Sequence, residues 1–245
     1  NFNEELKKYI FDPLYNDIKN NDKYDFYILY NKPKKSDKDL HLDGINVISF
    51  DNEYIFEKYK HLYFGRDAYN TFYMIYEFYL LHKEYDYYWT IEDDVYFTRK
   101  WNDLFNYYEN TTYDLICTHY YTSISYPWNY QYLNDTLQKP YFTKKTFGLT
   151  FLPIARLSNN LINTIITSDL YYNVFQEIQV GSIVRRYNLS IDIMEKFHLD
   201  LSESNDINRG SCSWGGYENN MITLFLENKN IIIHPFKRKH YKLLN

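Results

Sequence analysis

The alternation of helix-like and strand-like patterns along the chain restricts its fold more than any other feature. Residues 3–20 carry apolar side chains at a four-residue spacing, typical of an amphipathic helix, and Pro13 is expected to kink or split that helix. Such an alternation, with nearly continuous apolar strands, predicts an α/β fold whose mostly parallel central sheet is flanked by helices. We expect strands at 24–30, 46–50, 85–91, 113–119 and 231–233, and helices at 67–83, 101–108, 157–168, 172–187 and 219–226.

The composition is that of a globular protein. The chain has 245 residues, of which 45% are apolar and 24% charged, and no linker or repeat divides it. A net charge of −5 without a dominant basic block argues against nucleic acid as a partner. The 30 Tyr, 17 Phe and 4 Trp fit two interpretations, which are aromatic faces for stacking on sugar rings and the bias of an AT-rich coding sequence.

The sequence contains no segment that we expect to span a membrane. Its longest apolar run, 71–81, is too short for a bilayer and contains Glu77. Cys117 and Cys212 have no paired spacing, which favours a reducing compartment over a disulfide. We therefore expect a cytoplasmic protein, either free or associated with a membrane surface. Because the chain begins with Asn rather than Met, a removed N-terminal signal, anchor or first strand stays open as an alternative.

Three consecutive acids follow the strand-like run at 85–91, namely Glu92, Asp93 and Asp94, and a second apolar run begins at Val95. Carboxylates in such a place repel one another and are costly to desolvate unless a cation or hydrogen-bond donors neutralise them. Hard oxygen ligands select Mg²⁺ or Mn²⁺. The pattern therefore predicts a divalent-cation site, and a solvated acidic turn is the alternative.

The segment from Arg66 and Asn70 to this acidic cluster resembles the nucleotide-binding half of GT-A fold glycosyltransferases. Their DxD-type motif, at a strand end, holds a divalent cation on the diphosphate of a nucleotide sugar. The resemblance implies that Asp94 is the first metal ligand, with Glu92 beside it, and that Glu92 and Asp93 lie against the nucleotide sugar. It also implies that Arg66 and Asn70 face the nucleotide, whereas a plain helix-start charge is the alternative for Arg66.

A second stretch resembles the Trp-Gly-Gly-Glu segment of several GT-A families, which lies on the acceptor side of the site. Here it consists of Trp214, Gly215 and Gly216, with an additional Tyr217 before Glu218. The resemblance implies that Trp214 stacks on the acceptor sugar, that the two glycines allow the backbone to approach, and that Glu218 is the catalytic base. A plain helix cap is the alternative reading of the same residues.

His234 ends the strand-like run at 231–233, and Lys237 follows it. The resemblance implies that His234 is a metal ligand, and Lys237 is suited to binding a diphosphate. Glu177, between two apolar helical patches, is the reserve candidate for the base. The basic residues at 237–242 also fit a solvated tail or a weak contact with anionic lipid headgroups.

These features together predict a glycosyltransferase with a single GT-A-like domain, in which 1–100 form the nucleotide-sugar half and 101–245 the acceptor half. It would transfer a sugar from a nucleotide diphosphate sugar, most commonly a UDP-sugar in this family, to a hydroxyl of a glycan, a lipid-linked sugar or a protein. The cofactor would be Mn²⁺ or Mg²⁺. We expect the Tyr-rich residues 120–141 to form a lid or acceptor wall. A noncatalytic carbohydrate-binding domain and a metal-dependent nucleotidyltransferase or phosphohydrolase are the alternatives.

Overall fold

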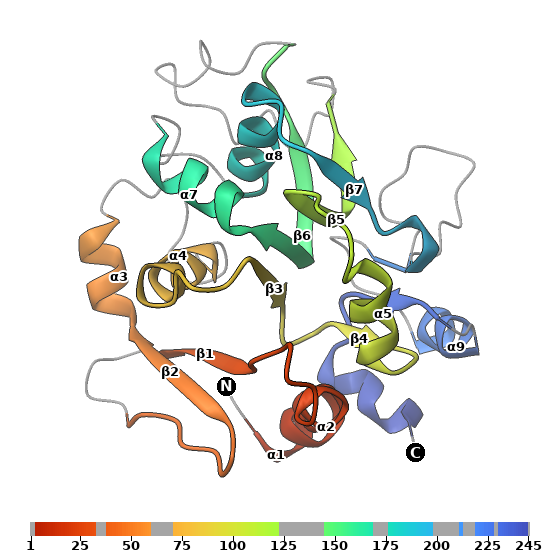
Figure 1. Ribbon diagram of the computed structural model, residues 1–245. Helices are drawn as coiled ribbons and strands as arrows, with labels where there is room; N and C mark the ends of the chain where they lie inside the picture. Colours follow the sequence, from red (N-terminus) through yellow and green to blue (C-terminus); the bar gives the residue numbers. More distant parts are fainter. Residues whose placement is uncertain are drawn as a thin grey trace. The chain divides into compact units, whose positions relative to one another are not determined.

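Alternating segments of the chain build two units (Figure 1). The first unit consists of Asn1–Phe26, Ile91–Thr112 and Ile193–Asn245, and the second of Tyr27–Thr90 and Tyr113–Asp192. A computed structural model describes residues 3–32, 38–59, 71–122, 145–168, 176–197, 211–212, 219–227 and 230–244.

The first unit begins with the predicted amphipathic helix, which has three parts: α1 (Glu4–Leu6), the wider π-helical turn η1 (Lys7–Phe11) and α2 (Asp12–Ile18). Its four regularly spaced apolar residues, Leu6 to Ile18, are all buried. Pro13 follows the point at which the π-helical turn η1 gives way to α2, and Phe11 and Asp12 keep helical backbone angles. The helix is therefore not split at Pro13, and its hydrogen-bonding pattern changes just before this residue.

A short antiparallel ribbon completes the core of the first unit. Strand β4 (Tyr96–Phe97) pairs with β8 (Ile232–Ile233), and η5 (Arg238–Leu244) follows β8. Helices α5 (Trp101–Tyr108) and α9 (Asn219–Glu227) and the turn η4 (Glu195–Phe197) belong to the same unit. The buried cluster behind the ribbon joins α1, η1, α9, β8 and η5 and contains Leu6, Ile10, Ile222, Phe225, Ile231, Ile233, Phe236 and Tyr241.

The second unit contains a parallel strand pair and a mixed sheet. Strands β1 (Tyr27–Lys32) and β2 (Asn46–Asp51) are parallel, and α3 (Asn52–Lys58) follows β2 directly because Asp51 caps it. The four-stranded sheet has the order β3 (Tyr87–Ile91), β6 (Leu149–Ser158), β5 (Leu115–Tyr121) and β7 (Ile191–Ile193). Within it β5 and β6 are antiparallel.

Helix α8 (Gln176–Arg186) packs closely on β6 (Figure 1). The approach depends on two glycines, because a Cβ atom on Gly181 would lie 2.6 Å from the carbonyl carbon of Gly148. The Ser182 hydroxyl donates to the Gly148 carbonyl (3.1 Å) and accepts from its N–H (3.0 Å). Both the backbone and the side chains therefore fix α8 against the start of β6.

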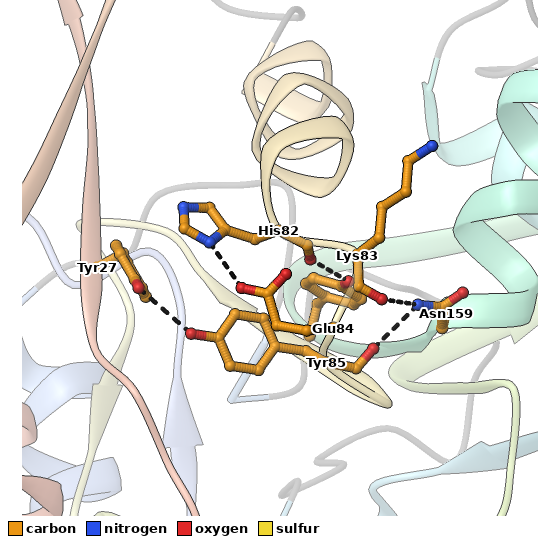
Figure 2. A network of polar contacts seen from close by, with 7 residues as sticks. Tyr27, His82, Lys83, Glu84, Tyr85 and Asn159 are labelled. Carbon is orange, nitrogen blue, oxygen red and sulfur yellow. Dashed lines mark hydrogen bonds and ion pairs between the residues drawn. The ribbon is translucent and has the colours of Figure 1, made fainter.

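A polar network joins the end of α4 (Thr71–Leu81) to the start of α7 (Asn159–Thr167), as Figure 2 shows. The Asn159 side-chain amide donates to the carbonyls of Lys83 (2.9 Å) and Tyr85 (3.0 Å). Nearby, His82 hydrogen-bonds Glu84 (2.9 Å), and the hydroxyls of Tyr27 and Tyr85 are 3.3 Å apart. Asn159 thus donates hydrogen bonds to two carbonyls of a turn that lies outside the helices and strands.

The α/β class and most of the expected elements are confirmed, although α3 and β7 were not expected, and three further features differ. The four-stranded sheet is mixed rather than mostly parallel, since β5 and β6 run in opposite directions. Strand β6 replaces the first residues of the helix expected at 157–168. The basic residues near the C-terminus lie in and beside the turn η5 rather than in a tail: His240 is buried there, whereas Lys237, Arg238, Lys239 and Lys242 are exposed to solvent, as expected. No helix among the described residues has the length and apolar character needed to cross a membrane.

Candidate functional site

The pairing of β4 with β8 brings the acidic cluster next to His234. Tyr96 is opposite Ile233 in the antiparallel register, so Asp94 precedes β4 at the same end of the ribbon at which His234 follows β8. Two backbone hydrogen bonds hold this end together: Phe236 N–H donates to the Asp94 carbonyl (2.7 Å), and His234 N–H donates to the Ser211 carbonyl (2.9 Å). The backbones of both segments are therefore fixed.

Three side chains converge at this end of the ribbon. The Nε2 atom of His234 lies 3.3 Å from Oδ1 of Asp94 and 3.4 Å from Oε2 of Glu92. One ligand atom from each of the three residues lies within 4.8 Å of the other two. Lys237 contacts the second carboxylate oxygen of Asp94. The side chains of His234 and Asp94 are only 10% and 14% exposed, whereas Glu92 is 38% exposed, so the group is open to solvent on the Glu92 side.

The charges of this group strongly shift its ionisation. Burial favours a raised pKa for Asp94, but the hydrogen bonds to His234 and Lys237 outweigh it and lower the pKa to about 2. Burial likewise favours a lowered pKa for His234, but the Asp94 and Glu92 carboxylates raise it to about 9. In the absence of a bound cation, Asp94 is thus an anion and His234 a cation near neutral pH.

The three converging side chains fit a divalent cation. Since an octahedral cation holds its ligands about 2.1 Å away, neighbouring ligand atoms lie roughly 3.0 Å apart. The two separations from His234 Nε2 are only slightly larger than this. Carboxylates suit Mg²⁺ and Mn²⁺, and an imidazole is a ligand typical of transition metals. Glu92, Asp94 and His234 are therefore the described residues that could hold a metal.

Asp93 is not one of the three converging side chains. Its side chain is exposed, whereas Asp94 and Glu92 face His234. The protein atoms around its carboxyl and the negative charges of Asp94 and Glu92 raise its pKa, although the residue as a whole is open to solvent. Asp93 is thus available to a bound molecule rather than to the group that surrounds His234.

Glu177 belongs to the second unit and has a structural environment. It is buried on α8, and its carboxylate accepts a hydrogen bond from Leu152 N–H in β6 (3.3 Å). Its carbonyl accepts another from the Thr150 hydroxyl (2.9 Å). These contacts fix α8 to β6, so Glu177 helps to hold the helix against the sheet, and its role as the reserve base stays a prediction.

Several predicted site residues lie outside the described residues. These are the nucleotide-facing Arg66 and Asn70, the acceptor-side Trp214, Gly215 and Gly216, and Glu218. Most of the expected lid, 120–141, lies outside them too. The structure thus brings together Glu92, Asp94, His234 and Lys237.

The sequence patterns did not indicate two features of the site. One is the contact between Lys237 and Asp94, because Asp94 was interpreted as a metal ligand and Lys237 as a diphosphate contact. The other is the support of His234 by Ser211 and Cys212, where Cys212 forms a parallel bridge with His234. The two apolar runs at 95–97 and 231–233 contain the strands of the ribbon. They were the only sequence pattern that pointed to the pairing which creates the site.

No protein-family model matches this chain, and no curated protein has a matching sequence.

Proposed function

We propose that this protein is a metal-dependent glycosyltransferase with a single GT-A-like domain. It would transfer a sugar from a nucleotide diphosphate sugar, a UDP-sugar in the first instance, to the hydroxyl of a glycan, a lipid-linked sugar or a protein. The observation that carries the proposal is the convergence of Glu92, Asp94 and His234, with Lys237 beside them, at one end of the β4–β8 ribbon. This set of residue types is the one that the resemblance of the sequence implies.

Asp94, Glu92 and His234 would hold the cation, and their mixed oxygen and nitrogen ligands favour Mn²⁺ over Mg²⁺. When bound, the cation supplies positive charge that stabilises the diphosphate as it leaves the sugar. Lys237, whose side chain is 57% exposed, would bind a phosphate oxygen from the same side. Exposed Asp93 lies beside these groups and would hydrogen-bond to a hydroxyl of the donor.

The remaining roles rest on the sequence. Arg66 and Asn70 would face the nucleotide, and Trp214, with Gly215 and Gly216, would form the acceptor side. Glu218 would take the proton from the acceptor hydroxyl if the configuration of the sugar is inverted. Because the Glu177 carboxylate accepts a hydrogen bond from Leu152 N–H, Glu218 stays the first candidate base and Glu177 the reserve. The free and buried thiols of Cys117 and Cys212 support a reducing, cytoplasmic location.

A panel of nucleotide sugars tests the proposal. Release of nucleoside diphosphate would be measured for each donor with Mn²⁺, with Mg²⁺ and with a chelator, first with water and then with sugar acceptors. We expect turnover of one donor that requires the cation and disappears in Asp94→Asn. Asp103→Asn is the matched control, because Asp103 is an exposed acid of the same unit that pairs with Arg99.

Each outcome of this experiment has a clear meaning. Turnover that persists in Asp94→Asn would remove the metal role of that residue. Release of pyrophosphate from a nucleoside triphosphate, in a parallel reaction with a sugar phosphate, would identify a nucleotidyltransferase. Binding of sugars without any effect of nucleotide or cation would identify a carbohydrate-binding domain.

A further inference from the structure

Both carboxylate oxygens of Asp94 are already engaged by groups of the protein itself. Oδ1 faces His234 Nε2 at 3.3 Å, and Oδ2 contacts the Lys237 ammonium. A cation that binds Asp94 therefore binds a carboxylate whose second oxygen already contacts the positively charged Lys237. Two positive charges on one carboxylate repel each other, so Lys237 and the cation compete for Asp94.

Lys237 is the partner that can move. Its side chain is 57% exposed, whereas that of Asp94 is 14% exposed. The backbone on both sides is fixed, because Phe236 N–H donates to the Asp94 carbonyl and Lys237 N–H donates to Nδ1 of buried His240 (3.0 Å). Only the flexible four-carbon stem of the lysine is free to carry its charge to a new position.

We propose that Lys237 exchanges partners when the site is loaded: it neutralises Asp94 in the cation-free protein and turns to a phosphate of the donor once a cation takes its place. This inference rests on the proposed function. The exchange explains why the exposed Lys237 contacts the nearly buried Asp94. It also couples the binding of the cation to the binding of the donor. The cation frees Lys237 for the diphosphate, and the diphosphate in turn lowers the cost of displacing Lys237 from Asp94, because such coupling is reciprocal.

The test is a titration with Mn²⁺ alone. The signal of the free ion in electron paramagnetic resonance measures how much Mn²⁺ remains unbound. The titration compares the unchanged protein, Lys237→Met and Lys239→Met. Methionine keeps the length of the stem and removes its charge. Lys239 is an exposed lysine of the same segment for which the structure gives no contact with Asp94, so it controls for the loss of one positive charge.

We expect Lys237→Met to bind Mn²⁺ about two- to fivefold more tightly, the range that follows if a partly exposed ion pair must first be broken. Lys239→Met should bind as the unchanged protein does. A second titration, with UDP and with Mn²⁺ at saturation, should show that Lys237→Met binds UDP at least about fivefold more weakly than the unchanged protein does. The reason is that a charged contact with phosphate is lost. Circular dichroism would verify that each variant is folded.

The failures of the two proposals differ. Equal Mn²⁺ affinity of the unchanged protein and Lys237→Met would overturn the exchange and leave the cation site intact. Tighter Mn²⁺ binding with unaltered UDP affinity would overturn the transfer of Lys237 to phosphate. Absence of Mn²⁺ binding in all three proteins would overturn the cation site and the exchange together.

Discussion

The Nε2 atom of His234 lies 3.3 Å from Oδ1 of Asp94, although the two residues belong to chain segments far apart in the sequence. The β4–β8 pairing creates this relationship, and it makes Asp94 the centre of the group, because Asp94 contacts both His234 and Lys237. Glu92 contacts His234 alone among these residues and is more exposed. The two acids should therefore contribute unequally to binding a cation.

We predict that Asp94→Asn weakens Mn²⁺ binding at least tenfold more than Glu92→Gln does. Amide replacement removes the negative charge in both cases, but it does so at 14% exposure for Asp94 and at 38% for Glu92, where water can replace the lost ligand. Mn²⁺ titration monitored by paramagnetic resonance would measure both. Asp103→Asn and Glu109→Gln, partly exposed acids of the same unit that pair with Arg99 and Lys23, serve as controls. A larger loss in Glu92→Gln would contradict this order.

Gly181→Ala should destabilise the protein although the residue lies inside a helix. Alanine in a helix interior is ordinarily more favourable than glycine by about 1 kcal/mol. Here its Cβ atom would lie 2.6 Å from the Gly148 carbonyl carbon. This carbon belongs to the backbone, so no change of side-chain rotamer can relieve the clash. Overpacking of this kind costs about 1–3 kcal/mol, so we expect a net loss of the free energy of unfolding. Urea unfolding would measure the loss, with Asn163→Ala on the exposed face of α7 as a control that should be neutral or stabilising.

Asn159→Asp tests the network of Figure 2. The change keeps the shape of the side chain, but it removes the N–H donors to the carbonyls of Lys83 and Tyr85 and places a carboxylate near both oxygens. A carboxylate in the first turn of α7 gains about 0.3–1 kcal/mol from the helix dipole. The lost hydrogen bonds and the repulsion cost about 1–3 kcal/mol, which is larger. We therefore expect a lower free energy of unfolding, measured by urea denaturation, and Asn163→Asp should show no comparable decrease.

Local patterns were sufficient for most helices and strands because their apolar residues had a clear period. The helix at 101–108 begins and ends as expected, since Trp101, Leu104, Phe105 and Tyr108 form one buried face. Strand β6 was missed because all of its ten residues are buried, so no alternation distinguishes it from a helix. Its Pro153 also argues against a central strand, but the register between β5 and β6 shifts at this point, where the missing N–H is tolerated.

The candidate site was only partly predictable for a different reason. Acids after a strand and a histidine after another strand are local signals, and both were recognised. Whether they meet depends on the pairing of Tyr96 with Ile233, which no local pattern specifies. The contact between Lys237 and Asp94 is still harder to predict from the sequence, because a charged side chain at a strand end can face solvent, a ligand or a neighbouring acid.

The carboxylate of Asp114 predicts how the stability of the second unit depends on pH. It joins three elements: Oδ1 accepts from the Ser158 hydroxyl (2.9 Å) and the Asn160 amide (3.1 Å), and Oδ2 accepts from Ser190 N–H (2.9 Å) and its hydroxyl (2.8 Å). Partial burial favours a raised pKa for Asp114, but the hydrogen bonds from Asn160, Ser190 and Ser158 outweigh it and lower the pKa below its ordinary value.

Because the folded protein lowers this pKa, the ionised carboxylate stabilises the fold. The contribution is complete above the pKa of the unfolded chain, about 3.9, and is lost as the pH falls through the lower pKa of the folded protein. Asp114→Asn should therefore reduce the free energy of unfolding by about 1–3 kcal/mol at pH 7, as expected for hydrogen bonds to a charged group. Urea unfolding of both proteins at several pH values would show this difference shrinking below pH 4. A difference as large at pH 2 as at pH 7 would show that the charge of Asp114 is not what stabilises this junction.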